Sequence, residues 1–153
     1  MPDIEHATVQ KNEFRTQAES IANEVEYNYQ MYIKSLEYPM PFYFDPPVAA
    51  DNKLKFMWDN SFDFRGQELK YTFELATSYT FKNILYKKTD ILIPGAEYKM
   101  LPDGQYFYRI TVTNKSGKTQ TAQYYYDDEK DIRHFGIDTF YIQNGKVLTE
   151  NPK

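Results

Sequence analysis

Apolar side chains near the start of the chain recur in steps of three or four residues. They are Phe14, Ala18, Ile21, Val25, Tyr29, Tyr32 and Leu36. This spacing places them on one face of an α-helix, and neither glycine nor proline interrupts residues 12–37. Asn12 is one candidate N-cap, and the capping-box sequence from Thr16 to Glu19 is another. One helix cannot bury such a stripe alone, so the stripe must pack on the following domain, on another chain or on a segment outside this sequence.

A proline-rich segment follows the predicted helix. Pro39 ends the helix, because proline disfavours the helical conformation of the residue before it. Residues 39–50 hold four prolines, together with Phe42, Tyr43 and Phe44. We expect an extended connector that packs through its aromatic rings. A proline-rich docking peptide is the functional alternative.

From Asp51 onward, the hydrophobic period changes to two residues, the pattern of strands with one buried face. The candidate strands are residues 54–58, 69–75, 84–86, 91–93, 106–112, 120–125 and 135–142. Turn sequences rich in glycine separate them, and Asn144-Gly145 predicts a small terminal hairpin. Seven short strands within roughly 100 residues, with no helical pattern between them, indicate a mainly β protein with a β-sandwich.

The chain of 153 residues therefore divides into four predicted parts. They are an acidic amphipathic helix (residues 1–38), a proline-rich connector (residues 39–50), a β-sandwich (residues 51–143) and a terminal hairpin or tail (residues 144–153). The helical part holds seven acidic and three basic residues, which accounts for the whole net charge of −4. Neither the helical part nor the remainder of the chain has the dense basic patch that phosphate backbones attract, so nucleic-acid binding is not expected.

The composition excludes several kinds of site. Without cysteine there is no disulfide, no zinc–thiolate site and no cysteine nucleophile. No apolar run approaches the roughly 20 residues of a membrane span, and the first residues lack the pattern of a signal peptide. The six glycines are never fewer than nine positions apart, which rules out a glycine-rich phosphate loop. We expect a protein that is not an enzyme and needs no cofactor.

Two motifs resemble a fibronectin type III domain. That family has a core tryptophan on its second strand and a tyrosine corner at the start of its sixth strand. Trp58, at the end of the first alternating segment, matches the tryptophan. Tyr106, which follows the sequence LPDG at residues 101–104, matches the corner. The resemblance gives both residues structural roles. Residues 117–136 depart from it, because they are far longer than the usual last hairpin loop.

A larger part of the chain resembles the C-terminal region of CotH-family proteins, the spore-coat-H-like proteins of Gram-positive bacteria. The resemblance spans residues 13–142 and includes the sequences YPMPFYF, WDNSFDFRGQELKYTFELA, LPDGQYFYRITVTNKSGKTQ and HFGIDTFYI. It implies a non-catalytic accessory or interaction module, in a spore coat or cell envelope. Its partner would be an upstream kinase-like domain, or another protein, bound through the N-terminal helix. The family's ATP-binding and catalytic residues precede this region, so the resemblance transfers no kinase activity.

Few side chains suggest chemistry. His134 is predicted to be an exposed loop histidine rather than part of a Ser-His-Asp arrangement. Asp59, Ser61 and Asp63 supply oxygens at alternate positions, as calcium loops do, but a turn held by local hydrogen bonds explains them better. The acidic cluster at residues 127–131 is predicted to be a solvated loop, with a calcium site as the alternative.

The most suggestive sequence is Tyr124-Tyr125-Tyr126. Consecutive strand residues point to opposite faces, so the three rings cannot all be buried on one side. At least one ring is expected at the surface, where it could stack on a sugar or anchor a partner. The chain has 15 tyrosines, and plain packing in a half-buried strand is the simpler interpretation. A carbohydrate-binding module that uses these tyrosines, with polysaccharide as partner, is therefore the alternative function.

Overall fold

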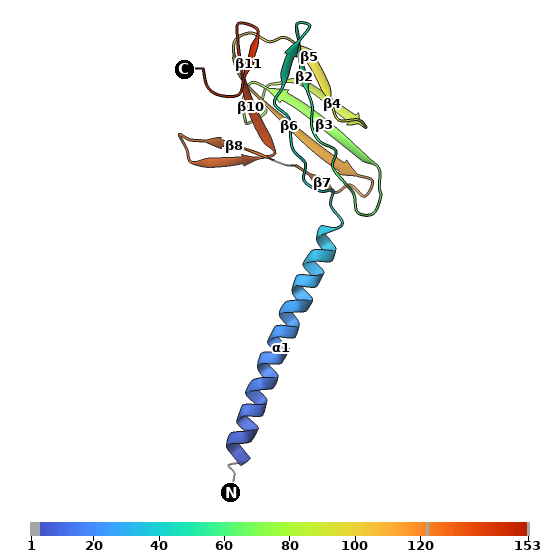
Figure 1. Cartoon of the computed structure of the whole chain (residues 1–153), viewed down its shortest axis with the longest axis vertical. Helices are drawn as coiled ribbons and strands as arrows, with labels where there is room; N and C mark the ends of the chain where they lie inside the picture. Colours follow the sequence, from blue (N-terminus) through green and yellow to red (C-terminus); the bar gives the residue numbers. More distant parts are fainter. Residues whose placement is uncertain (1–3, 122, 153) are drawn as a thin grey trace. The chain divides into compact units, whose positions relative to one another are not determined.

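The computed structural model describes residues 4–121 and 123–152. It divides into two compact units, Met1–Glu37 and Tyr38–Lys153, each described here by itself. Within the described residues, the first unit holds one helix, and the regular secondary structure of the second unit consists of antiparallel strands. The predicted architecture, a mainly β protein with a β-sandwich preceded by one helix, is confirmed (Figure 1).

Helix α1 spans Ile4–Ser35 and is longer than the sequence pattern predicted. Neither proposed N-cap is correct, because Asn12 and Thr16 both lie inside the helix. The Thr16 hydroxyl donates instead to the carbonyl of Asn12, at 3.0 Å, within the helix. The six apolar residues Phe14, Ala18, Ile21, Val25, Tyr29 and Tyr32, here called the α1 stripe, are all exposed.

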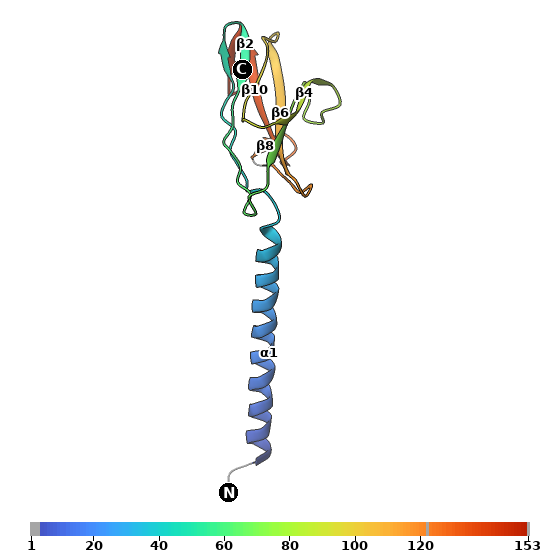
Figure 2. The ribbon, with the colours of Figure 1, turned by 90° about the vertical axis from the view of Figure 1, so that its right-hand side faces the viewer.

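Eleven strands follow within the described residues. They are β1 (Val48–Ala50), β2 (Lys53–Phe56), β3 (Leu69–Ala76), β4 (Ile84–Ile91), β5 (Ala96–Lys99), β6 (Gly104–Asn114), β7 (Thr119–Gln120), β8 (Tyr124–Asp127), β9 (Ile132–Phe135), β10 (Ile137–Gln143) and β11 (Lys146–Leu148). One sheet has the order β1-β2-β5 and the other has the order β11-β10-β6-β3-β4, with β7 paired to β6. The two sheets form the two layers seen in Figure 2. Strands β8 and β9 form a separate two-stranded ribbon.

The main core lies between the two sheets and is unusually aromatic. Phe56 from one sheet contacts Phe73, Tyr108 and Phe140 from the other, with ring centroids 4.7–5.6 Å apart. Trp58 is 4% exposed, and its ring stacks on Phe73 with an interplanar angle of 3°. Tilted and edge-on ring pairs of this kind add to the burial of apolar surface.

The proline-rich segment belongs to this core. Phe42 and Phe44 are buried, and Phe44 forms an isolated antiparallel bridge with Trp58. The strand predicted over residues 54–58 therefore ends early, at Phe56, and Trp58 continues the layer by pairing with the proline-rich segment. Tyr43, between the two phenylalanines, is 72% exposed, as the alternation of an extended chain requires.

A tyrosine hydroxyl ties the start of β6 to the loop before it. The Tyr106 hydroxyl donates to the carbonyl of Pro102, four residues upstream, at 2.6 Å, the geometry of a tyrosine corner. Gly104 has φ +156°, and a Cβ there would lie 3.6 Å from the Tyr106 hydroxyl oxygen. That distance is an ordinary van der Waals contact, so the positive φ, rather than the space beside the ring, favours glycine at this position.

Several strand boundaries differ from the sequence expectation. The strand predicted over residues 91–93 does not form, because only Ile91 lies in a strand, as the last residue of β4. A strand that was not predicted, β5, begins just after the Pro94-Gly95 turn and forms an edge of the other sheet. The short polar segment AEYK has only one fully buried side chain, Ala96, so its hydrophobic alternation is too weak to reveal it. The segments 120–125 and 135–142 are each divided between two strands, and this division creates the β8–β9 ribbon.

Candidate functional site

The β8–β9 ribbon arises where the sequence departs from the fibronectin type III pattern. Its strands pair Tyr124 with Phe135, Tyr125 with His134 and Tyr126 with Arg133. Because neighbouring residues point to opposite faces, the three tyrosines separate. Tyr124 and Tyr126 lie on one face with Arg133 and Phe135, and this set is called the ribbon outer face. Tyr125 lies on the other face with His134.

The ribbon outer face is an exposed cluster of rings with a charge at its edge. Tyr124 and Phe135 are 49% and 73% exposed, and their rings meet edge to face at 6.0 Å. The Arg133 guanidinium lies 5.2 Å from the centre of the Tyr124 ring, a cation–π contact. Together with Tyr126 and Asp131, these residues line an open hollow of about 560 Å³.

A hydrogen bond to Asp131 holds Tyr126, the second tyrosine of the ribbon outer face, in place. The Tyr126 hydroxyl donates to Asp131 Oδ1. This hydrogen bond raises the pKa of the exposed Tyr126 phenol above its ordinary value, because deprotonation would lose the bond and place two negative charges together. The phenol therefore stays neutral at physiological pH, and the carboxylate retains lone pairs that can accept from a ligand.

The opposite face of the ribbon packs on the sandwich. Tyr125 meets Phe107 edge to face at 5.1 Å, and His134 stacks on Tyr79 at 4.3 Å. These contacts extend a second hydrophobic cluster on the outer side of β6, which includes Phe81. The prediction that His134 is an exposed loop residue is wrong, because the residue lies in β9 and its side chain is half-buried against the rings of Tyr79 and Tyr125.

A glutamine clamps the start of the ribbon to the sandwich. The Gln123 side chain donates to Asp138 Oδ2 at 2.9 Å and accepts from the backbone amide of Phe44. Asp138 also accepts from the Tyr108 hydroxyl at 3.3 Å. Burial raises the pKa of Asp138 above its ordinary value, and the hydrogen bonds that it accepts oppose the shift. The orientation of the ribbon thus depends on a partly buried polar network.

The acidic cluster at residues 127–131 forms the turn that joins the two ribbon strands. Asp127 is buried, and its carboxylate accepts from the amides of Glu129 and Lys130 at 3.1 and 3.3 Å. Hydrogen bonds of this kind hold a turn together. The cluster is thus a capped turn rather than a uniformly solvated loop, because its first residue points inward.

Ser61 and Asp63 have side-chain partners, and the backbone amide of Asp59 donates to the carbonyl of Tyr43 at 2.9 Å. Asp63 is buried and accepts from the amide of Gln67 at 2.8 Å and from the Asn114 side chain at 3.2 Å. The Ser61 hydroxyl donates to the carbonyl of Met40. Within residues 4–121 and 123–152, no three histidine or acidic side chains gather in a way that could hold a metal ion.

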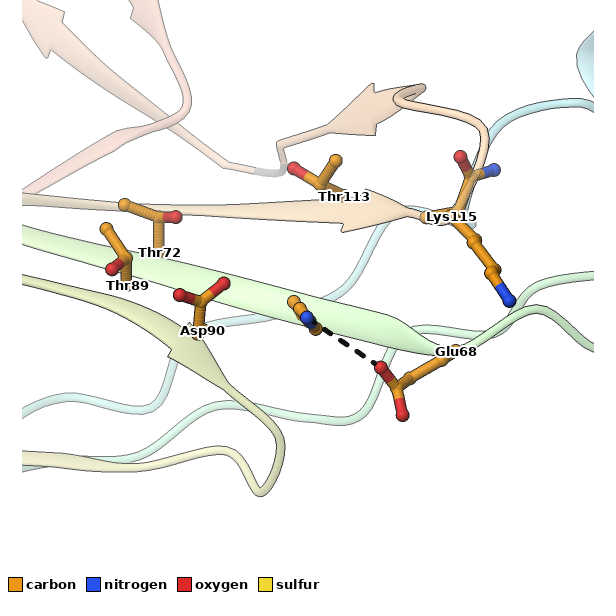
Figure 3. A pocket seen from close by; sticks show the side chains of 8 residues that line it. Glu68, Thr72, Thr89, Asp90, Thr113 and Lys115 are labelled. Carbon is orange, nitrogen blue, oxygen red and sulfur yellow. Dashed lines mark ion pairs between the residues drawn. The ribbon is translucent and has the colours of Figure 1, made fainter.

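A second hollow, of about 600 Å³, lies over β3, β4 and the end of β6 (Figure 3). Threonine hydroxyls and charged side chains line it, among them Thr72, Thr113 and Asp90. Its Lys70–Glu68 ion pair is 4.0 Å long and exposed, so it contributes little to stability. These side chains are polar but lack the ring surface of the ribbon outer face, which is why the ribbon is the stronger candidate.

Sequence reasoning found the tyrosines of this face but missed their neighbours. Arg133 and Phe135 belong to β9, and the predicted strand over residues 135–142 placed Phe135 in the sandwich sheet. The missed signal is Gly136, which has φ +79° and breaks that segment in two. A turn at residues 128–131 followed by the alternation of β9 would then have shown a hairpin that pairs Tyr124 with Phe135.

Among the helices of residues 4–121 and 123–152, none combines the length and apolarity needed to cross a membrane. No protein-family model and no curated protein matches the chain. The assignment of a function must therefore come from the ribbon outer face and its chemistry.

Proposed function

We propose that the chain is a non-catalytic interaction module that contacts its ligand through the ribbon outer face. The single observation that supports this most strongly is the exposure of Tyr124 and Phe135 side by side on a ribbon whose other face is anchored. The exposure of large aromatic rings to water is unfavourable in free energy, and such rings are typical of contact surfaces. The anchored face keeps them in place before a ligand arrives, which reduces the entropy lost on binding.

The side chains around the hollow are suited to holding a ligand rather than to cleaving it. Arg133 packs over a ring, and Asp131 accepts a hydrogen bond from Tyr126. A binding surface needs such rings and fixed polar edges, whereas a catalytic centre needs an activated nucleophile or a tuned acid and base. We expect no turnover of ATP with magnesium and generic protein substrates. Activity that survives repurification and disappears on a point substitution within this chain would contradict the proposal.

Carbohydrate is the ligand class that this surface fits best. A sugar ring has an apolar face that can lie against Tyr124 or Phe135, and hydroxyl groups at its edge. Arg133 can donate to those hydroxyls, and Asp131 can accept from them. The hollow is open rather than enclosed, and this favours an extended polymer over a small buried molecule. The resemblance to CotH-family proteins supports the broader accessory role, in which the module holds a neighbouring domain near an envelope or coat.

Retention on insoluble polysaccharides tests this proposal directly. The full chain is sedimented with cellulose, xylan, chitin and peptidoglycan, and the unbound fraction is measured. We expect retention on at least one of these, and at least a tenfold loss of affinity in Tyr124→Ala, because stacking on one ring contributes roughly 1–3 kcal/mol by analogy with base stacking. Tyr43→Ala is the matched control, since Tyr43 is exposed on the sandwich and away from the ribbon pairs.

The ligand class and the binding surface can be disproved separately. If none of the four polysaccharides retains the unmutated chain, carbohydrate is the wrong ligand class. If the chain is retained and Tyr124→Ala and Tyr43→Ala bind equally well, the ribbon outer face is the wrong surface. Melting curves of all variants accompany the assay, because a loss of retention counts only when the fold is intact.

A further inference from the structure

The α1 stripe is a second unpaired surface, and it follows a repeat of eleven residues. Phe14 and Val25, Ala18 and Tyr29, and Ile21 and Tyr32 are each eleven positions apart. Eleven residues complete about three helical turns at 3.67 residues per turn, close to the 3.6 of a straight α-helix. The stripe therefore runs almost parallel to the axis of α1, and a straight partner helix can follow it from end to end.

The exposed apolar surface of the stripe is large enough for a stable interface. Phe14, Ile21, Val25, Tyr29 and Tyr32 are each 56–73% exposed. Together they expose on the order of 600 Å² per helix, given about 200 Å² for a large side chain. Two copies would bury roughly 1,200 Å², above the roughly 1,000 Å² expected of a specific interface. A helix that leaves this much apolar surface in water gains stability when a second helix covers it.

We propose that α1 pairs with α1 of a second copy of this chain in antiparallel orientation, with the α1 stripe at the interface. Reversing one helix places Phe14 opposite Tyr32 and Ile21 opposite Val25. It also places Ala18 opposite Tyr29, so the smallest side chain of the stripe faces a large ring. A parallel pair would instead set each tyrosine against itself. The stripe is thus complementary to its own reverse, as an isologous interface requires.

The self-association test uses the full chain and does not depend on the ribbon outer face. Sedimentation equilibrium over a dilution series is expected to show a monomer–dimer equilibrium. Ile21→Glu combined with Val25→Glu should weaken dimerisation by at least about a hundredfold, because four charges would enter the interface of the dimer. Thr16→Glu combined with Asn23→Glu adds the same charge on the opposite side of α1 and should leave dimerisation unchanged.

Three results would overturn the proposal. The first is an unmutated chain that stays monomeric at every concentration. The second is a dimer that survives the two substitutions in the stripe while circular dichroism shows an intact helix. The third is equal weakening by both double variants, which would mean that charge alone, rather than the stripe, controls association.

Cross-linking tests the orientation, because the chain contains no cysteine of its own. Gln17 and Asn28 are eleven residues apart and lie along the same edge of the stripe. In an antiparallel pair that edge meets its counterpart, so Gln17 of one copy lies beside Asn28 of the other. An oxidised mixture of Gln17→Cys and Asn28→Cys should give the mixed dimer. Cross-linking of Gln17→Cys with itself, without the mixed product, would overturn the antiparallel pairing.

Discussion

The side-chain nitrogen of Gln123 lies 2.9 Å from Asp138 Oδ2 and joins the start of the ribbon to strand β10 of the main sheet. The amide of Phe44 occupies the oxygen of the same glutamine. Gln123 therefore cannot rotate its amide without losing a hydrogen bond on each side. This contact makes the ribbon outer face depend on the protonation of a carboxyl group that lies behind it.

Stability should fall as pH rises through the range just above the ordinary pKa of an aspartate. Burial raises the pKa of Asp138, so in this range the folded chain holds a proton that the unfolded chain has released. The folded state then binds more protons, and its free energy of unfolding decreases with rising pH. The contribution is fully present below the unfolded pKa and is lost as pH passes through the raised folded pKa.

Asp138→Asn isolates this effect from the other acidic groups. The variant is expected to lose a constant amount of stability, because an amide has one oxygen and cannot accept all the hydrogen bonds that Gln123, Tyr108 and Thr139 donate to the two oxygens of Asp138. Relative to the unmutated chain, however, its stability should rise with pH across the same range. Urea midpoints at a series of pH values measure the difference. A difference that does not change with pH would show that Asp138 titrates normally in the folded chain.

Tyr106→Phe should destabilise the sandwich by about 1 kcal/mol, the net contribution of one hydrogen bond. The substitution removes the hydroxyl that donates to Pro102 and keeps the ring, which packs on Phe140 at 5.7 Å. Urea unfolding followed by fluorescence measures the change. Tyr43→Phe is the control, because the Tyr43 side chain is 72% exposed and lies outside the core. Equal midpoints for both variants would mean that the corner hydrogen bond adds nothing to stability.

Trp58→Ala should cost about 3–5 kcal/mol, through lost burial and the cavity that remains. The side chain is 4% exposed and contacts the rings of Phe73 and Tyr71. Phe62→Ala is the matched control, since that ring is 60% exposed and its loss should change stability by no more than about 0.5 kcal/mol. An unchanged urea midpoint for Trp58→Ala would contradict its place in the core.

Gly136→Ala should loosen the ribbon more than Gly145→Ala loosens the terminal hairpin. Both glycines have a positive φ, +79° and +75°, so both substitutions carry a similar backbone strain of about 1–2 kcal/mol. At Gly136 the new Cβ would also lie 2.9 Å from Thr121, whereas the space around Gly145 is open. Amide hydrogen exchange should rise more in β8 and β9 of Gly136→Ala than it rises in β11 of Gly145→Ala. Similar increases in both variants would mean that the backbone strain explains the loosening and that the contact with Thr121 adds nothing.

Residues 38–153 expressed without α1 should unfold in a single cooperative transition. Every side chain of the main hydrophobic core comes from Phe42 or later residues. Thermal unfolding followed by circular dichroism measures the transition. A broad, non-cooperative melt would show that the sandwich unit needs the helix in order to fold.

The sequence by itself determined the elements whose periodicity is long and regular. The stripe from Phe14 to Tyr32 and the alternation of β3 and β6 follow directly from the spacing of apolar residues, because that spacing fixes which face can be buried. Trp58 and Tyr106 were singled out differently, because their positions resemble the core tryptophan and the tyrosine corner of a fibronectin type III domain. The class of the fold depends on these long elements, and it was therefore predictable.

Only the tertiary structure decided the candidate site. The three consecutive tyrosines are chemically identical in the sequence, and what separates Tyr125 from its neighbours is the packing of Phe107 and His134 on one side of the ribbon. At Gly136 the chain passes so close to Thr121, 15 positions earlier, that an added Cβ would lie 2.9 Å from the Thr121 side chain. Contacts between distant segments decide which ring is buried and which is exposed. A pattern read along one strand contains no information about them.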